Sequence, residues 1–197
     1  MPKKIPEHHS LRKIFRSATN FGFWHSDLRD REAASYISDE ILVEFTYVDN
    51  LYKIRNAKGK RLEDIAEMLI EGELPNMNVM DYYEGKRAFY KHIGDYALFI
   101  TGLFPESLKG MKETRHDYIL GSLIIPTGNP LSYYMERGKR AYKEVSAFYS
   151  MNEREEALFR RLAEKFYNYM CALNLARAYL DSLKNKDYQQ IKRILLE

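Results

Sequence analysis

The longest helical pattern in this chain runs from Asn78 to Pro105. The second half, Gly94–Phe104, carries a single charge, Asp95, and is apolar on nearly every side. A helix that is apolar all round belongs inside a bundle, so we predict a central buried helix over about residues 79–104. Steps of three and four, as one helical face requires, separate most of its apolar residues: Val79, Tyr82, Phe89, Ile93, Tyr96, Ile100 and Leu103.

Amphipathic stripes elsewhere predict three further long helices and two shorter ones, over residues 30–54, 129–148 and 152–180, and over 62–71 and 187–197. Two of the long helices begin with recognisable N-terminal signals. Asn129 is followed by Pro130, a residue favoured at the first helical position. Asn152 stands three residues before Glu155, as in a capping box.

Together these patterns predict an all-α protein, a single-domain helical bundle of four long helices plus short ones. The bundle is expected over residues 26–197, and residues 1–25 are expected to form an N-terminal arm. This arm is basic at its start and ends in an aromatic turn around Gly22. It either packs its aromatic residues on the bundle or touches phosphate groups or a lipid surface.

Composition narrows the function. The 197 residues are 45% hydrophobic and 30% charged, which excludes a disordered chain. The net charge of +3 is too small to indicate nucleic-acid or membrane binding by the whole chain. A single cysteine, Cys171, excludes an intrachain disulfide.

No apolar run approaches the ~18 residues of a membrane span, and no secretory signal is visible, so we expect a cytoplasmic protein. Plentiful Glu and Lys with two Gln are compatible with a thermophilic source.

One stretch resembles a known family. The pattern G-D-x-x-L-F-x-x-G-x-F-P-E, here Gly94–Glu106, is similar to a motif of uncharacterised bacterial all-helical proteins, and Ser132–Tyr142 resembles that family's second motif. Similar positions extend over about residues 31–177. The resemblance implies a compact helical fold in a bacterial cytoplasm. It implies no activity.

The central helix also carries the main candidate site. His92 and Asp95 lie three residues apart and share a helical face. We expect this pair to lie beside three residues of the next long helix: Tyr133, Tyr134 and Arg137. Buried ionisable groups need partners, so we expect Asp95 to be buried and bonded from another helix. The pair is then either a structural core group or part of a small ligand pocket.

Two basic pairs suggest a second candidate site. Lys86 with Arg87, and Lys139 with Arg140, are most simply solvated helix surfaces. If the bundle brings the two pairs together, they form an anion-binding site.

Metal and catalytic chemistry lack support in the sequence. Glu113 and His116 match the E-x-x-H pair of di-iron proteins, but that site needs a second pair, and none occurs. Phosphate-binding, dinucleotide-binding and nucleophile-elbow motifs are missing too. We therefore predict no metal, no cofactor and no catalytic residue.

Three functions remain. The first is a non-enzymatic helical interaction or regulatory module, working through a protein partner or as a dimer. The second is a ligand-binding or enzymatic bundle centred on His92 and Asp95. The third is anionic-surface binding, to nucleic acid or membrane, through the N-terminal arm.

Overall fold

The computed structural model describes residues 6, 9–72, 79–112, 129–148 and 152–196, and their side chains apart from 79–83, 109–112, 187, 191, 194 and 195. The described residues form helices and, apart from an isolated bridge between Arg55 and Arg61, no β-structure. The predicted all-α class is confirmed. In chain order the helices are α1 (Ser10–His25), α2 (Arg31–Tyr36), η1 (Ile37–Leu42), α3 (Val48–Leu51), α4 (Ile65–Gly72), α5 (Val79–Leu103), η2 (Pro105–Lys112), α6 (Pro130–Ser146), α7 (Glu153–Glu164), α8 (Phe166–Ser182) and α9 (Lys186–Leu196).

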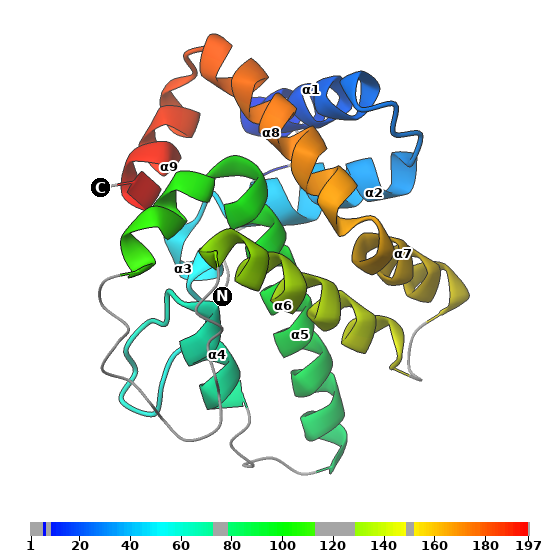
Figure 1. Cartoon of the computed structure of the whole chain (residues 1–197), viewed down its shortest axis with the longest axis vertical. Helices are drawn as coiled ribbons and strands as arrows, with labels where there is room; N and C mark the ends of the chain where they lie inside the picture. The colour runs from blue at the N-terminus through cyan, green and yellow to red at the C-terminus, as the bar shows by residue number, and fades with distance from the viewer. Residues whose placement is uncertain (1–5, 7–8, 73–78, 113–128, 149–151, 197) are drawn as a thin grey trace.

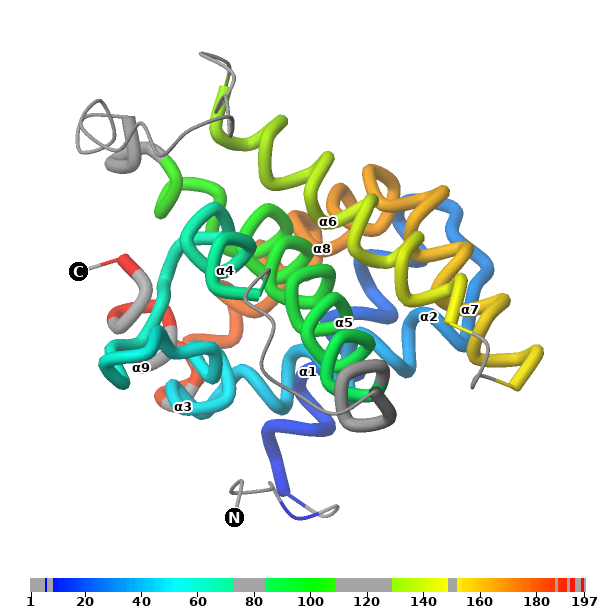
Figure 2. Tube along the Cα trace, turned by 90° about the horizontal axis from the view of Figure 1, so that it is seen from below, coloured from blue at the N-terminus to red at the C-terminus, as the bar shows by residue number. Residues whose placement is uncertain are grey.

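Helix α5 runs from the lower edge of the molecule into its middle (Figure 1) and contacts α4, η1, α6 and α8. Seen from below, α4 and α6 lie beside α5 (Figure 2). Every residue from His92 to Phe104 is buried, as the apolar second half predicts. Burial does not extend over the whole predicted range, because residues 84–91 are exposed or half-buried. The central helix is thus enclosed only over its second half.

Part of the expected N-terminal arm is a helix of the bundle. From Ser10 onward it forms the 16-residue α1, which packs along α8. The two backbones approach closely at Gly22, where a methyl group would lie 2.0 Å from the carbonyl oxygen of Ala172. Leu11 and Phe15 bury their side chains on the same packed side. The apolar face of α1 therefore belongs to the core.

Two of the predicted long helices are broken. The helix expected over residues 30–54 contains the π-helical η1 and ends before a turn at Phe45–Tyr47, where the Thr46 hydroxyl donates to the Val43 carbonyl at 2.6 Å. The helix expected over residues 152–180 breaks at Lys165, whose φ of −104° and ψ of 21° lie outside helical geometry. The break lets α7 pack on α6 while α8 packs on α1 and α5.

Both predicted helix starts are confirmed. The Asn129 side chain accepts a hydrogen bond from the Leu131 N–H at 3.1 Å, and Asn152 accepts from the Glu155 N–H at 2.9 Å. In the part of the chain described, no helix has both the length and the apolar character to span a bilayer.

Candidate functional site

Asp95 is the polar centre of the bundle. The residue is 5% exposed, and its carboxylate accepts hydrogen bonds from two other helices. The Tyr36 hydroxyl of α2 donates at 2.6 Å and the Tyr142 hydroxyl of α6 donates at 2.9 Å, both to Oδ1. Lys91, one turn earlier on α5, donates to Oδ2 at 3.0 Å. The expectation that Asp95 is buried and bonded from another helix is confirmed.

The partners on α6 differ from the expected ones. Tyr142 bonds to Asp95, whereas Arg137 lies over the ring of Tyr133 with its guanidinium carbon 5.1 Å from the ring centre. Tyr134 is buried, and its ring centre is 6.5 Å from that of Tyr96. The cause is the register between α5 and α6. Gly138 abuts Ala97, so the next turn of α6 brings Tyr142 against Gly94 beside Asp95.

Burial and the nearby carboxylate act together on the two tyrosines. Burial raises the pKa of the Tyr36 hydroxyl well above 10, and the negative charge of Asp95 raises it further. The pKa of the Tyr142 hydroxyl is raised by the same two causes. Both hydroxyls thus remain protonated and donate hydrogen bonds to Asp95. The ammonium group of Lys91 balances the negative charge of the carboxylate.

His92 shares the helix face of Asp95 but has different surroundings. It is 1% exposed, and neither ring nitrogen makes a hydrogen bond of good geometry to a described residue. Its ring packs edge-on against Phe45, with ring centres 5.5 Å apart, and near Tyr96. Burial lowers the pKa of His92 well below 6.5, and the charges of Lys53 and Lys91 lower it further, although the Leu51 backbone acts in the opposite direction. His92 is therefore a neutral core residue at physiological pH.

The structure does not bring the two predicted basic pairs together. Lys139 and Arg140 follow Gly138, which abuts Ala97 of α5, whereas Lys86 and Arg87 lie about ten residues earlier on α5. At 1.5 Å per residue this spacing is about 15 Å along the helix. Arg87 also donates to Glu155 at 3.4 Å, and Lys139 donates to Glu136 at 3.0 Å. Both contacts offset the positive charge that an anion would need.

The two arginines of α1 are likewise engaged in ion pairs. Arg16 donates to Asp39 of η1 at 2.8 Å, and Arg12 lies 3.8 Å from the same carboxylate. The earlier basic residues Lys3 and Lys4 lie outside the described residues, as does the E-x-x-H pair of Glu113 and His116. Among the side chains that the structure places, no cluster of His, Cys, Asp and Glu could hold a metal ion.

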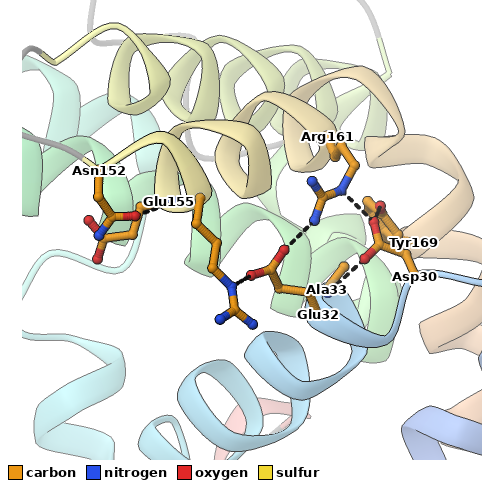
Figure 3. A network of polar contacts seen from close by, with 8 residues as sticks. Asp30, Glu32, Ala33, Asn152, Glu155, Arg161 and Tyr169 are labelled. Carbon is orange, nitrogen blue, oxygen red and sulfur yellow. Dashed lines mark hydrogen bonds and ion pairs between the residues drawn. The ribbon is translucent and has the colours of Figure 1, made fainter.

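A second polar network, which sequence reasoning missed, joins the start of α2 to α7 and α8 (Figure 3). Arg161 donates to Asp30 at 2.8 Å and to Glu32 at 2.6 Å, and the Tyr169 hydroxyl donates to Asp30 at 2.8 Å. Burial alone would raise the pKa of Asp30, but the bonds from Ala33 N–H, Arg161 and Tyr169 lower it. The structure shows Asp30 as the N-cap of α2, and an aspartate at the start of a helical stripe is the sequence signal that could have indicated it.

Three residues of the motif that carries the family resemblance, Gly94, Gly102 and Glu106, make contacts between helices. A methyl group at Gly94 would lie 2.6 Å from the Tyr142 ring, and one at Gly102 would lie 2.7 Å from Leu173. Glu106, the last motif residue, accepts two hydrogen bonds from Arg177 of α8, the one from Nη1 at 2.6 Å. These residues hold α5 against α6 and α8.

The outside of the α1–α8 pair carries large apolar side chains. Trp24, the single tryptophan of the chain, is 82% exposed. Phe21, one turn before it, stacks on Tyr179 of α8 with ring centres 5.0 Å apart and lies 4.3 Å from the His25 ring. Leu175 and Leu183 stand four residues to either side of Tyr179 and are 39% and 42% exposed. We call this surface the aromatic face: Phe21, Trp24, His25, Leu175, Tyr179 and Leu183.

No family model, curated protein or solved structure matches this chain. The resemblance of residues 94–106 to a bacterial family therefore stays a prediction, and the function has to be argued from the molecule itself.

Proposed function

We propose that this protein is a non-enzymatic helical module that works through protein contacts made by its aromatic face. The observation that carries the proposal is the 82% exposure of Trp24. A tryptophan that serves the core buries most of its ring, and an exposed aromatic cluster marks an interaction surface. The family resemblance supports a bacterial cytoplasmic setting for this role.

The predicted polar site supports the same choice. The carboxylate of Asp95 already has donors from Tyr36, Tyr142 and Lys91. The ring of His92 is packed among Phe45 and Tyr96. Because protein side chains occupy the surroundings of both residues, they favour a structural role over ligand binding or catalysis.

A photo-crosslinking amino acid placed at Trp24 tests the proposal in the protein's own host cell. Ile70 on α4 is the matched control, because it is also an exposed apolar residue, 38% exposed, on a different helix. We expect a discrete covalent adduct from position 24 and none from position 70, with the captured protein identified by mass spectrometry. Position 24 giving no adduct above the level at position 70 would contradict the proposed function.

A further inference from the structure

The segment between η1 and α4 lies against α5 through a few apolar side chains. We call residues 44–62 the flap, and α3 lies within it. Most of its side chains are exposed or half-buried. Three are buried: Phe45, Leu51 and Leu62. The Phe45 ring packs edge-on over His92 of α5, with ring centres 5.5 Å apart. Just beyond the flap, the Tyr96 hydroxyl of α5 donates to the Glu63 carbonyl at 2.6 Å.

Polar contacts within the flap join its own residues to one another. The Asn50 side chain donates to the Glu44 carbonyl at 3.1 Å and to the Glu44 carboxylate at 3.0 Å. The Asp49 carboxylate forms ion pairs with Arg55 and Arg61. Helix α3 itself makes few contacts with the other described helices. A surface segment that is bonded largely to itself can separate from the body of a protein at a lower free energy than global unfolding requires.

His92 is the buried polar residue that the flap covers. In the closed structure a protonated imidazole would be a buried charge without a hydrogen-bond partner of good geometry among the described residues. The positive charges of Lys53 in the flap and of Lys91 on α5 also disfavour protonation, and the Leu51 backbone offsets part of this effect. When the flap separates, water reaches the imidazole ring and Lys53 leaves with the flap. Protonation of His92 therefore favours the open form.

The other ionisable groups around His92 do not compensate a positive charge on its ring. On α5, the carboxylate of Asp95 already accepts hydrogen bonds from two tyrosine hydroxyls and from Lys91. In the flap, the Glu44 carboxylate accepts from Asn50. The Tyr96 hydroxyl is uncharged, because burial raises its pKa well above 10. The closed form thus has little to hold a protonated histidine in place.

We propose that the flap is an acid-sensitive cover of α5, which opens when His92 is protonated while the rest of the bundle stays folded. Opening would expose Phe45 and, on α5, Phe99, whose ring centres lie 5.2 Å apart in the closed form. An exposed histidine has a pKa of about 6.5. Because opening is coupled to the uptake of one proton, the equilibrium should shift toward the open form by up to about tenfold per pH unit below this value. The flap and the aromatic face consist of different residues, so this proposal does not depend on the proposed function.

Thiol labelling of a cysteine placed in the flap tests the cover. Leu51→Cys reports on the flap and Leu173→Cys, at a buried position of α8, reports on global unfolding. Each is made together with Cys171→Ser, so that the full chain carries one thiol. The labelling rate is divided by the rate in urea at the same pH, which cancels the pH dependence of the thiol and gives the opening equilibrium. Circular dichroism checks that each variant is folded.

We expect position 51 to open at least ~10-fold more often than position 173 at pH 7.5, since local opening costs less free energy than unfolding. Between pH 7.5 and 5.5 the opening at position 51 should rise by up to about tenfold. The added substitution His92→Phe should abolish this rise, and His25→Phe, at an exposed position, should retain it. His92→Leu repeats the test with a smaller side chain in case the phenylalanine is not accommodated.

Three results would overturn the proposal. Equal opening at positions 51 and 173 would mean that the flap is released only by global unfolding. Opening at position 51 that does not change between pH 7.5 and 5.5 would mean that no proton is taken up. A rise as large in the folded His92 variants as in the protein with His92 would assign the acid sensitivity to another group.

Discussion

At the scale of single residues, Asp95 and His92 show opposite solutions to burial on one helix face. The buried carboxylate of Asp95 accepts hydrogen bonds from two tyrosine hydroxyls and from Lys91, which take the place of water. His92 has no comparable partner among the described residues and is accommodated by losing its charge. Removing one donor from Asp95 leaves a buried charge partly unsolvated, whereas protonating His92 creates a buried charge.

The pH dependence of stability follows from His92. The pKa of His92 in the folded protein lies well below 6.5, its value in an unfolded chain. Below pH 6.5, therefore, the histidine binds a proton in the unfolded chain but stays neutral in the folded protein. The stability from a neutral His92 is complete above pH 6.5 and is lost as the pH falls below it. We expect urea denaturation to show a loss of up to about 1.4 kcal/mol per pH unit in this acid range.

The variant His92→Phe should flatten this dependence, because phenylalanine fits an aromatic environment and cannot be protonated. His25→Phe, on the exposed end of α1, is the control and should keep the slope of the unaltered protein. Equal slopes for His92→Phe and the unaltered protein would show that other groups cause the acid sensitivity.

At the scale of helices, glycines set the distances between neighbours. Gly22 lets α1 approach the backbone of α8, Gly94 accommodates the ring of Tyr142, and Gly138 lies against Phe166 and Ala97. Each contact fixes the register of a helix pair. The register in turn decides which polar residues meet, as the pairing of Tyr142 with Asp95 shows.

Gly22→Ala tests this close packing. The added methyl group would lie 2.0 Å from a backbone oxygen, which cannot move aside as a side chain can, so the helices must separate. We expect a loss of about 1–3 kcal/mol in unfolding free energy, measured by chemical denaturation. Ser17→Ala, at an exposed position of the same helix, should be neutral or slightly stabilising. An unchanged stability for Gly22→Ala would contradict the close approach of α1 to α8.

Helical periodicity predicted the class, the enclosed half of α5 and two N-caps, because burial stripes and capping residues are local in sequence. It missed the break at Lys165, since the apolar stripe continues from Phe159 to Leu180 while its two halves cover different neighbours. Asp95 was identified as buried and bonded, but its partner on α6 was not. That partner depends on helix register, which a stripe alone does not contain.

At the scale of the whole molecule, long-range polar contacts join segments far apart in the chain. Arg161 of α7 reaches Asp30 and Glu32 at the start of α2, and Arg177 of α8 reaches Glu106 after α5 (Figure 3 shows the first of these). Each holds the end of one helix against the side of another. They complement the apolar core, which by itself does not specify where helix ends lie.

The variant Arg161→Gln tests the contact between α7 and the start of α2, and the variant Arg160→Gln is its control. Arg161 is 29% exposed and bridges two carboxylates of another helix, whereas Arg160 is 58% exposed and pairs within α7 with Glu156. We expect thermal or chemical denaturation to show a loss of about 1–2 kcal/mol for Arg161→Gln. Arg160→Gln should cost less than about 0.5 kcal/mol. Equal losses would mean that the contacts of Arg161 to Asp30 and Glu32 add no stability.

The contact between α1 and α8 also has a consequence during biosynthesis. Gly22 and its neighbour Ala172 are separated by 150 positions of the chain. At ~5–20 residues per second, a ribosome needs about 7 to 30 seconds to make the intervening sequence. Throughout that interval the nascent chain carries the apolar side of α1 without its cover, which makes this segment a natural place for a chaperone to hold the growing polypeptide.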